Sequence, residues 1–499
     1  MIILDILPEE KIHSLPTRLE IGEEYPAFDV CKEYGRVADL SVAPDNTARL
    51  KKNFILKSKF GVDLLCVFYR QDNECSFKGL VSILSLLVND YHYVVLDLPS
   101  KMDRFVFQIL NQSDVIHILT SPKPIDLMRS YHLIEKLKST FSFPEAKIKV
   151  LVNEYKLSRL SHEQQLVILG HPIFATLPRI EFGRPDRQVL DEPGSEYTKA
   201  VRRIARQFGD CLVGLALGVG LAYGFCHIGV LKVLEEEKIP IDVISGASIG
   251  ALIAALWATG RSAQEILEIT KEFSEPNYIW GFMDFTFPRL GFIKGDRLFR
   301  FLKKHLGNKT FYDVRLPLKI VASDVKRKES RILDKGPLVD AIMASCAMPG
   351  VFTPFRFREE ILFDGGVITP LPTEVLFNMG IRKIIAINVT PSREDVIKQY
   401  EAIKGQVSDP QAAEKKRYFS LRRYLSEKFR NNILTIIFST VELMQSEIVQ
   451  KEAELADVVL HPDMQGLNWL QLHRAEDFAK RGEEEIRRNL DKIKQVVYE

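Results

Sequence analysis

The chain has 499 residues, a formal net charge of +2 and a hydrophobic share of 46%, values typical of a globular protein with two or three domains. The near-neutral charge gives no support for a nucleic-acid partner, so none is expected. The six cysteines are scattered without the pairs that a zinc site requires. We therefore expect reduced thiols, no bound metal and a cytoplasmic location. The first ten residues lack the basic segment of a secretory signal, and no uncharged apolar run reaches the roughly 18 residues that span a bilayer.

Residues 1–209 alternate short apolar runs with helical patterns, which is typical of βαβ units and a mostly parallel sheet. Four runs are predicted to be buried strands: 64–69, 93–98, 115–120 and 148–153. Helical patterns at 80–88 and 125–138 lie between them. We therefore expect an N-terminal α/β domain that covers residues 1–209.

The residues at the ends of these strands carry a resemblance to a known group. The segments that carry it are 95–99, 113–121, 150–153 and 169–178. They resemble the later strands of the ParA/MinD-type ATPases, and the likeness covers most of residues 1–208. The loop Gly-x-x-x-x-Gly-Lys-Ser/Thr, which binds nucleotide phosphates, does not occur, and Met1–Asp5 resembles the strand that would follow it. We expect a degenerate module or a chain that starts just after the loop, and we favour a structural or partner-binding role over ATP hydrolysis.

A serine motif follows a predicted strand in the second half of the chain. The apolar run 241–245 leads into Gly246-Ala-Ser248-Ile-Gly250, and a helical run, 251–258, follows at once. Gly-x-Ser-x-Gly between a strand and a helix is typical of a nucleophile elbow, where the turn leaves no room for side chains beside the serine. The helix behind it directs N–H groups and a partial positive charge towards the serine. A turn built of small residues is the structural alternative.

A glycine loop precedes the serine motif. The strand-like run 211–217 ends in Gly218, Gly220 and Gly224, and a helical run follows. In a parallel sheet the two turns lie at the same carboxyl edge, so the loop can offer its N–H groups to the oxyanion of a serine reaction. A dinucleotide site is the second interpretation, but it requires an acidic residue at the end of the next strand, whereas Asp242 opens that strand. Close helix–strand packing is the third.

The segment Asp364-Gly365-Gly366 follows a short apolar strand. By itself Asp-Gly-Gly is usually only a turn. Downstream of a glycine loop and a serine elbow, however, an aspartate at a strand end is the candidate base.

These segments together resemble the patatin-like phospholipase family, from about Leu212 to the C-terminus. The likeness rests on the glycine loop with His227-Ile-Gly-Val-Leu behind it, on the serine motif and on Asp364-Gly-Gly. It implies a three-layer α/β/α sheet domain, with a catalytic core at 210–385 and a helical extension at 386–499 that completes it. The whole chain is thus expected to be a two-domain α/β protein.

The resemblance also implies a function. The family hydrolyses acyl esters of lipids with a Ser–Asp dyad, which carries over to Ser248 as nucleophile and Asp364 as base. The oxyanion hole and substrate contacts carry over to the glycine loop: Gly218, Gly220, Leu221 and Gly224. The supporting turn glycines are Gly246, Gly250, Gly365 and Gly366. A lipid or lysophospholipid substrate is implied, without a cofactor.

The glycine loop departs from the family pattern, which has consecutive glycines followed by a basic residue. Val219 and Leu221 replace glycines, and Tyr223 stands where the basic residue is expected. A reduced rate or a changed substrate range is therefore expected, and the alternative is a catalytically impaired scaffold or regulatory lipid-binding protein.

A Ser–Asp–His triad with His461 or His473 is the competing mechanism, although we expect both histidines to be structural or exposed. His227 is expected to be a histidine packed in the core.

Residues 415–430 hold seven basic side chains against one Glu. Apolar residues recur there at steps of three and four, so a basic amphipathic helix is predicted. Such a helix can make peripheral contact with an anionic membrane. A core-packed helix with a solvated basic face is the favoured alternative.

Overall fold

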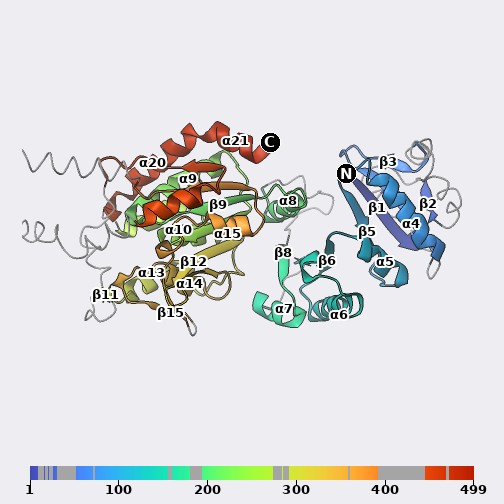
Figure 1. Cartoon of the computed structure of the whole chain (residues 1–499), viewed down its shortest axis with the longest axis horizontal. Helices are drawn as coiled ribbons and strands as arrows, with labels where there is room; N and C mark the ends of the chain where they lie inside the picture. The colour runs from blue at the N-terminus through green and yellow to red at the C-terminus, as the bar shows by residue number, and fades with distance from the viewer. Residues whose placement is uncertain are drawn as a thin grey trace, which may run out of the picture. The chain divides into compact units, whose positions relative to one another are not determined.

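The computed structural model describes residues 1–8, 16, 21, 26–30, 52–70, 74–154, 160–179, 194–273, 284, 291–357, 360–391, 444–467 and 471–499. The basic stretch 415–430 lies outside these ranges. The chain forms two compact units, Met1–Thr176 and Leu177–Glu499 (Figure 1). Within the described ranges, every helix is too short or too polar to cross a bilayer.

The first unit contains two sheets. In the five-stranded sheet β2, β4, β1 and β5 follow one another, and β3 pairs antiparallel with β4; β1 is parallel to both of its neighbours. The strands are β1 (Ile2–Pro8), β2 (Ala27–Asp29), β3 (Ile55–Lys57), β4 (Asp63–Tyr69) and β5 (Val94–Asp97). A second sheet has the order β6 (Ile116–Thr120), β7 (Ile148–Asn153) and β8 (Ile173–Leu177). The strands expected at 64–69, 93–98, 115–120 and 148–153 are present within one or two residues.

Helix α5 (Arg104–Gln112) contributes to both apolar cores of this unit. Phe105 lies in the core of the five-stranded sheet, and Phe107 lies in the core around β6 and β7. The other helices are α4 (Glu74–Leu87), α6 (Pro124–Phe141) and α7 (His162–Leu169). The alternation of strands with helices gives the α/β architecture that the sequence pattern predicts.

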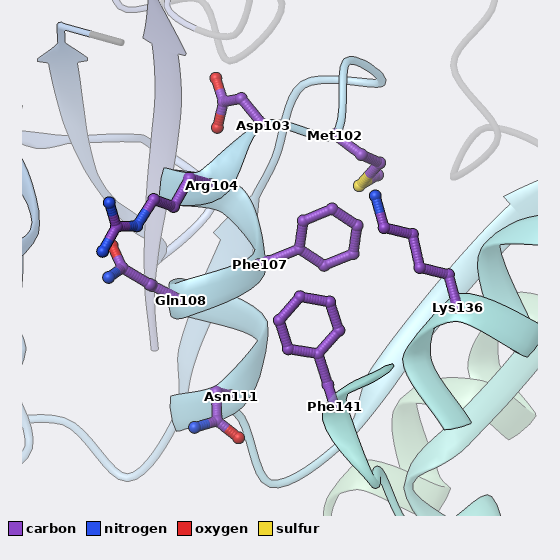
Figure 2. A pocket seen from close by; sticks show the side chains of 8 residues that line it. All are labelled: Met102, Asp103, Arg104, Phe107, Gln108, Asn111, Lys136 and Phe141. Atoms are coloured by element: carbon purple, nitrogen blue, oxygen red, sulfur yellow. The ribbon is translucent and has the colours of Figure 1, made fainter. Parts of the chain in front are cut away.

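A pocket of about 450 Å³ lies beside α5 and α6. Figure 2 shows the side chains that line it: Met102, Asp103, Arg104, Phe107, Gln108, Asn111, Lys136 and Phe141. The rings of Phe107 and Phe141 stack with centroids 4.7 Å apart, and the Lys136 ammonium lies 4.6 Å from the Phe107 centroid. The carboxylate of Asp103 accepts a hydrogen bond from the Val106 N–H and caps α5. These contacts join the two helices.

The second unit is built on an eight-stranded sheet with the order β15-β16-β12-β10-β9-β17-β18 and β13 on β12. The central strands β12, β10, β9, β17 and β18 are parallel, and β13 and β16 run antiparallel to β12. The strands are β9 (Val213–Leu217), β10 (Val243–Ala247), β12 (Leu318–Asp324), β13 (Glu329–Leu333), β15 (Phe355–Phe357), β16 (Glu360–Asp364), β17 (Lys383–Ile387) and β18 (Val458–Leu460). The short strands β11 (Gly291–Ile293) and β14 (Gly350–Phe352) pair separately.

Helices cover both faces of this sheet. Leu215 and Leu217 of β9 belong to a core shared with α9 (Cys226–Glu236), whereas Ala216 between them belongs to a core shared with α15 (Thr373–Asn378). Successive strand residues point to opposite faces, so the two cores lie on opposite sides of the sheet. The unit also contains a helix at 444–453, together with α10 (Ile249–Ala258), α11 (Ala263–Thr270), α13 (Asp296–Leu306), α14 (Leu338–Ser345), α20 (Ala475–Arg488) and α21 (Leu490–Tyr498). The unit is therefore a three-layer α/β/α sheet domain, as expected.

Helix α8 (Glu196–Phe208) also belongs to the second unit. Its Arg206 donates three hydrogen bonds to the carboxylate of the fully buried Asp242, which also accepts the N–H of Val213. The contact-based division of the chain thus falls at 176/177, ahead of α8, whereas the sequence pattern puts the boundary at 209/210. Asp242, the residue just before β10, is the ion-pair partner of Arg206.

Candidate active site

Ser248 lies at the turn between β10 and α10. Its backbone angles, φ 54° and ψ −123°, lie in a region that side chains rarely adopt. The glycines on either side permit a very tight turn. A Cβ added to Gly246 would lie 2.6 Å from the carbonyl oxygen of Gly250, and one added to Gly250 would lie 2.4 Å from that of Leu217. The Gly-x-Ser-x-Gly sequence therefore forms a strand–turn–helix in which neither glycine has room for a side chain.

The Ser248 hydroxyl donates a hydrogen bond of 2.6 Å to Oδ2 of Asp364. The other carboxylate oxygen accepts the N–H of Gly366 at 2.7 Å. Both side chains are nearly buried, with exposed fractions of 6% for Ser248 and 3% for Asp364. Burial raises the pKa of Asp364 to about 6, and the hydrogen bonds from Ser248 and Gly366 oppose that rise. The carboxylate is thus a stronger base than an exposed aspartate.

Strand pairing brings Asp364 beside Ser248. Strand β12 pairs with β10 on one side and with β16 on the other, and Asp364 is the last residue of β16. A Cβ added to Gly365 would lie 2.3 Å from the carbonyl oxygen of Val321 in β12, so only glycine lets the chain turn so closely. The Asp-Gly-Gly sequence thus keeps the carboxylate at the sheet edge.

Ser345 is a site residue that the sequence patterns did not single out. Its hydroxyl accepts the Ser248 N–H at 2.9 Å and donates to the Val321 carbonyl at 2.6 Å. It thereby fixes the backbone of Ser248 to β12. The neighbouring Cys346 is the second such residue: burial, then the Asp364 charge, raises the pKa of its thiol, which the Ser248 hydroxyl opposes. The only sequence signal for both is the small-residue segment 344–352.

The glycine loop offers two N–H groups. Gly218 donates its N–H to the Ile387 carbonyl, and Val219 donates to the Pro370 carbonyl, so these two are occupied. Within the described part of the chain, the N–H groups of Gly220 and Leu221 have no hydrogen-bond partner. They begin a short 3-10 helix, η3 (Leu221–Phe225), and Leu221 adopts φ 48°. Free N–H groups at a helix start are suited to an anion.

The remaining loop residues have packing contacts. A Cβ added to Gly224 would lie 2.2 Å from the Ile249 side chain, so Gly224 permits close contact with the residue after Ser248. Tyr223 is buried, and its ring centroid lies 5.8 Å from that of Phe478 in α20. The residue at the expected basic position therefore packs into the core.

No histidine of the described residues is hydrogen-bonded to Ser248 or Asp364. His461 Nδ1 contacts the Asn388 carbonyl, and His473 is exposed. His227 is fully buried, and burial lowers its pKa to about 4. The neutral ring therefore donates Nε2–H to the Gly218 carbonyl at 2.9 Å, which ties the loop to α9.

The fold and site define a three-layer α/β/α domain with a serine–carboxylate pair at a strand-to-helix turn. Residues 215–377 match the family model described as "Patatin-like phospholipase". The second unit therefore contains a patatin domain, as the motifs indicated.

Curated relatives match the same part of the chain. "Neuropathy target esterase sws" of Drosophila melanogaster is 32% identical over 209 residues, which are 41% of this chain and 14% of the relative. "Patatin-like phospholipase domain-containing protein 6" of Homo sapiens is 32% identical over 202 residues (40% and 15%). "Lysophospholipase NTE1" of Pyricularia oryzae is 29% identical over 210 residues (42% and 14%). The match thus spans about 14–15% of the length of these relatives.

Neighbours of ParA/MinD type, the group indicated by the strand ends, occur among solved structures. A ParA family ATPase from Chlorobium tepidum has a TM-score of 0.33 at 16% identity, covering 41% of this chain and 85% of that one. The MinC:MinD cell division protein complex of Aquifex aeolicus gives 0.32 at 18% identity, with coverages of 42% and 83%.

Proposed function

We propose that the chain is a serine lipid acyl hydrolase that cleaves a fatty acyl ester of a phospholipid or lysophospholipid. Ser248 acts as the nucleophile and Asp364 as the base. The observation that carries the proposal is the 2.6 Å hydrogen bond from the Ser248 hydroxyl to the buried carboxylate of Asp364 at a strand-to-helix turn. The matching family and the names of the relatives support the substrate class.

The proposed reaction proceeds through an acyl-enzyme. Asp364 takes the hydroxyl proton while Oγ of Ser248 attacks the ester carbonyl carbon. The N–H groups of Gly220 and Leu221 stabilise the oxyanion of the tetrahedral intermediate. The C–O bond to the lipid alcohol breaks, and the proton on Asp364 passes to that alcohol. Asp364 then accepts a proton from water, whose oxygen attacks the acyl carbon. The bond from the acyl carbon to Oγ of Ser248 breaks, the proton on Asp364 returns to Oγ, and the fatty acid is released.

Labelling with a fluorophosphonate probe tests the proposal, because the probe reacts with activated serines. We expect the purified chain to be labelled, Ser248→Ala to be unlabelled, and Asp364→Asn to be labelled at least about 100-fold more slowly, the lower end of the range for a lost acid–base group. Ser85→Ala, at an exposed position of α4, is the matched control and retains labelling. Release of fatty acid from lysophosphatidylcholine by the same variants tests the substrate class.

The alternative is a lipid-binding or scaffold protein without hydrolytic activity. It is favoured by one observation, the left-handed Leu221 in a loop whose expected basic residue is the buried Tyr223. Folded wild-type protein that is not labelled, yet binds lysophospholipid, is the result that selects this alternative.

A further inference from the structure

Two turns of the proposed site have to keep a fixed position relative to each other, since one carries Asp364 and the other carries the N–H groups of Gly220 and Leu221. Helix 444–453, which lies beyond the 215–377 range that the family model matches, contacts the first turn directly and the second through the peptide group between Pro370 and Leu371. Gln445 and Glu452 of this helix are seven positions apart, so they lie on the same helical face. Their exposed fractions are only 7% and 8%.

Gln445 contacts the turn that carries Asp364. Its side-chain amide donates to the Gly366 carbonyl at 3.0 Å, while the N–H of the same residue, Gly366, donates to Asp364 Oδ1. A Cβ added to Gly366 would lie 2.6 Å from the Gln445 amide nitrogen and 2.8 Å from the Val219 side chain. Gln445, the Asp364 turn and the start of the glycine loop therefore meet at Gly366.

Glu452 holds the other turn through one peptide group. Its carboxyl oxygen accepts the N–H of Leu371 at 2.7 Å. The carbonyl of the same peptide group, that of Pro370, accepts the N–H of Val219, the residue before Gly220, at 3.0 Å. Hydrogen bonds at the two ends of one peptide group strengthen each other. The backbone carbonyl of Glu452 also accepts the Thr373 hydroxyl at 2.6 Å, which fixes the helix to this segment.

We propose that Gln445 and Glu452 are positioning residues of the proposed hydrolase, and this inference rests on that function. Gln445 sets the orientation of the Asp364 turn, and Glu452 sets the position of the oxyanion N–H groups. Neither residue contacts the reacting atoms. They act by fixing, from one helix, the distance between the base and the oxyanion donors.

The chemistry of Glu452 identifies its proper replacement. Burial raises its pKa to about 8; the Leu371 hydrogen bond opposes this and Glu374 adds to it. The carboxyl group is therefore protonated at neutral pH, and Gln retains its carbonyl oxygen and its size. Glu452→Gln preserves the acceptor for Leu371, whereas Glu452→Leu removes it. Gln445→Met removes the donor to Gly366 at nearly constant volume.

The test measures kcat, KM and the pH profile with p-nitrophenyl butyrate, a short soluble ester. We expect kcat to fall about tenfold or more in Gln445→Met and Glu452→Leu, with KM changed less than about twofold, because displaced catalytic groups slow the chemical step. Glu452→Gln restores the rate. The matched controls Gln450→Met and Glu454→Leu, exposed neighbours of the same segment, keep the wild-type kcat.

The pH profile separates the two positions. Without the Gln445 donor the Gly366 turn is held less firmly and its N–H bonds Asp364 less well, which raises the pKa of Asp364, so the acidic limb of the kcat profile moves to higher pH in Gln445→Met. Glu452→Leu leaves that limb unchanged, because it acts on the oxyanion loop. A residue that serves stability alone would lower the melting temperature and leave the limb unmoved.

The outcomes distinguish the positioning role from the proposed hydrolase function on which it rests. Wild-type protein that is neither labelled by fluorophosphonate nor active on the ester overturns both. Active wild-type protein together with unchanged kcat in Gln445→Met and Glu452→Leu overturns the positioning role alone. Should Gln445→Met not unfold cooperatively, Gln445→Asn replaces it, because its amide falls one methylene short of Gly366 and the same loss is expected.

Discussion

Ser248 combines a strained backbone with a hydrogen-bonded side chain. A non-glycine residue at φ 54° and ψ −123° costs about 1–3 kcal/mol. Its N–H is held by Ser345 and its hydroxyl by Asp364, so the conformation is fixed from both sides. In this strained conformation the Ser248 hydroxyl points at the carboxylate of Asp364, the only carboxylate that it contacts among the described residues.

The ionisation of Asp364 predicts how activity depends on pH. The proposed base works only when ionised, and burial raises the pKa of Asp364 to about 6. We expect kcat/KM for a short ester to rise about tenfold per pH unit below pH 6 and to level off above pH 7. A stopped assay between pH 4.5 and 8.5 measures this. A rate that stays constant from pH 5 to pH 7 would contradict the assignment of Asp364.

The same shift affects stability with the opposite sign. A raised pKa in the folded state means that folding favours the protonated carboxyl, so stability is full below about pH 4 and decreases as pH rises to about 6. The decrease is at most about 3 kcal/mol for a shift of about two pKa units. Asp364→Asn keeps an acceptor for Gly366 and a donor for Ser248, and it should lack this decrease. Urea unfolding at pH 4 and pH 7.5 compares the two proteins.

At the residue scale, motifs point to Ser248 and Asp364 because their chemistry requires particular neighbours at fixed spacing. The sequence assigned Gly218 and Gly224 to the oxyanion loop, but the Gly218 N–H is bound to Ile387 and Gly224 contacts Ile249. Ser345 lies 97 positions from its partner. Such partnerships depend on tertiary contacts between distant segments, and no local pattern encodes them.

At the element scale, helices α9 and α20 cross closely, and α20 also packs against the 3-10 helix η3 of the glycine loop. Figure 1 shows these two helices side by side, and Phe478 of α20 makes the contact with η3. A Cβ added to Gly229 would lie 1.8 Å from the carbonyl oxygen of Ala479, and one added to Gly482 would lie 2.0 Å from that of Cys226. The two glycines let the helices touch backbone to backbone.

Gly229→Ala tests this crossing. Alanine normally stabilises a helix by up to about 1 kcal/mol over glycine. Here the added methyl must push α20 away, and we expect a net loss of about 3 kcal/mol, at the upper end for an overpacked core. Gly194→Ala, with nothing within 4 Å of the added Cβ, is the control and should change stability little. Urea midpoints that agree between Gly229→Ala and wild type would contradict the crossing.

The elements differ in how well local patterns predict them. Strands such as β4 and β7 are short apolar runs bounded by turn signals, and their positions agree with expectation. The sequence suggests glycines for close helix–strand packing after the glycine loop, whereas Gly229 packs against another helix, α20. The sequence contains no sign that β16 would pair antiparallel with β12, or that helix 444–453 would contact the Asp364 turn. Strand order and helix docking are set by packing between distant segments, which periodicity does not contain.

At the scale of the whole molecule, the position of α8 decides where the second unit begins. The helix follows a predicted α/β domain in the sequence, and its amphipathic pattern fits either side of a boundary. In the structure Arg206 pairs with Asp242, whose side chain is fully buried at the start of β10. A buried carboxylate needs a partner, and this electrostatic requirement, rather than the helical pattern, joins α8 to the second unit.

Arg206→Met is therefore predicted to destabilise the second unit. Removing one partner of a buried ion pair leaves the other charge unpaired and typically costs about 3–5 kcal/mol. Asp242 keeps the Val213 N–H, so we expect a loss of about 3 kcal/mol, at the low end of that range. Lys199→Met on the same helix, which breaks only an exposed pair with Glu196, should cost less than about 1 kcal/mol.

The two candidate boundaries then make different predictions for fragments. Residues 177–499 contain α8 and should unfold cooperatively, at a midpoint close to the one at which the second unit unfolds within the full chain. Residues 210–499 lack Arg206 and should show at least the loss seen in Arg206→Met, because deletion of α8 removes the ion pair and the rest of the packing of that helix. Chemical unfolding followed by circular dichroism compares them. Equal stability of the two fragments would instead place α8 outside the folded second unit and favour the boundary at 209/210 that the sequence pattern suggests.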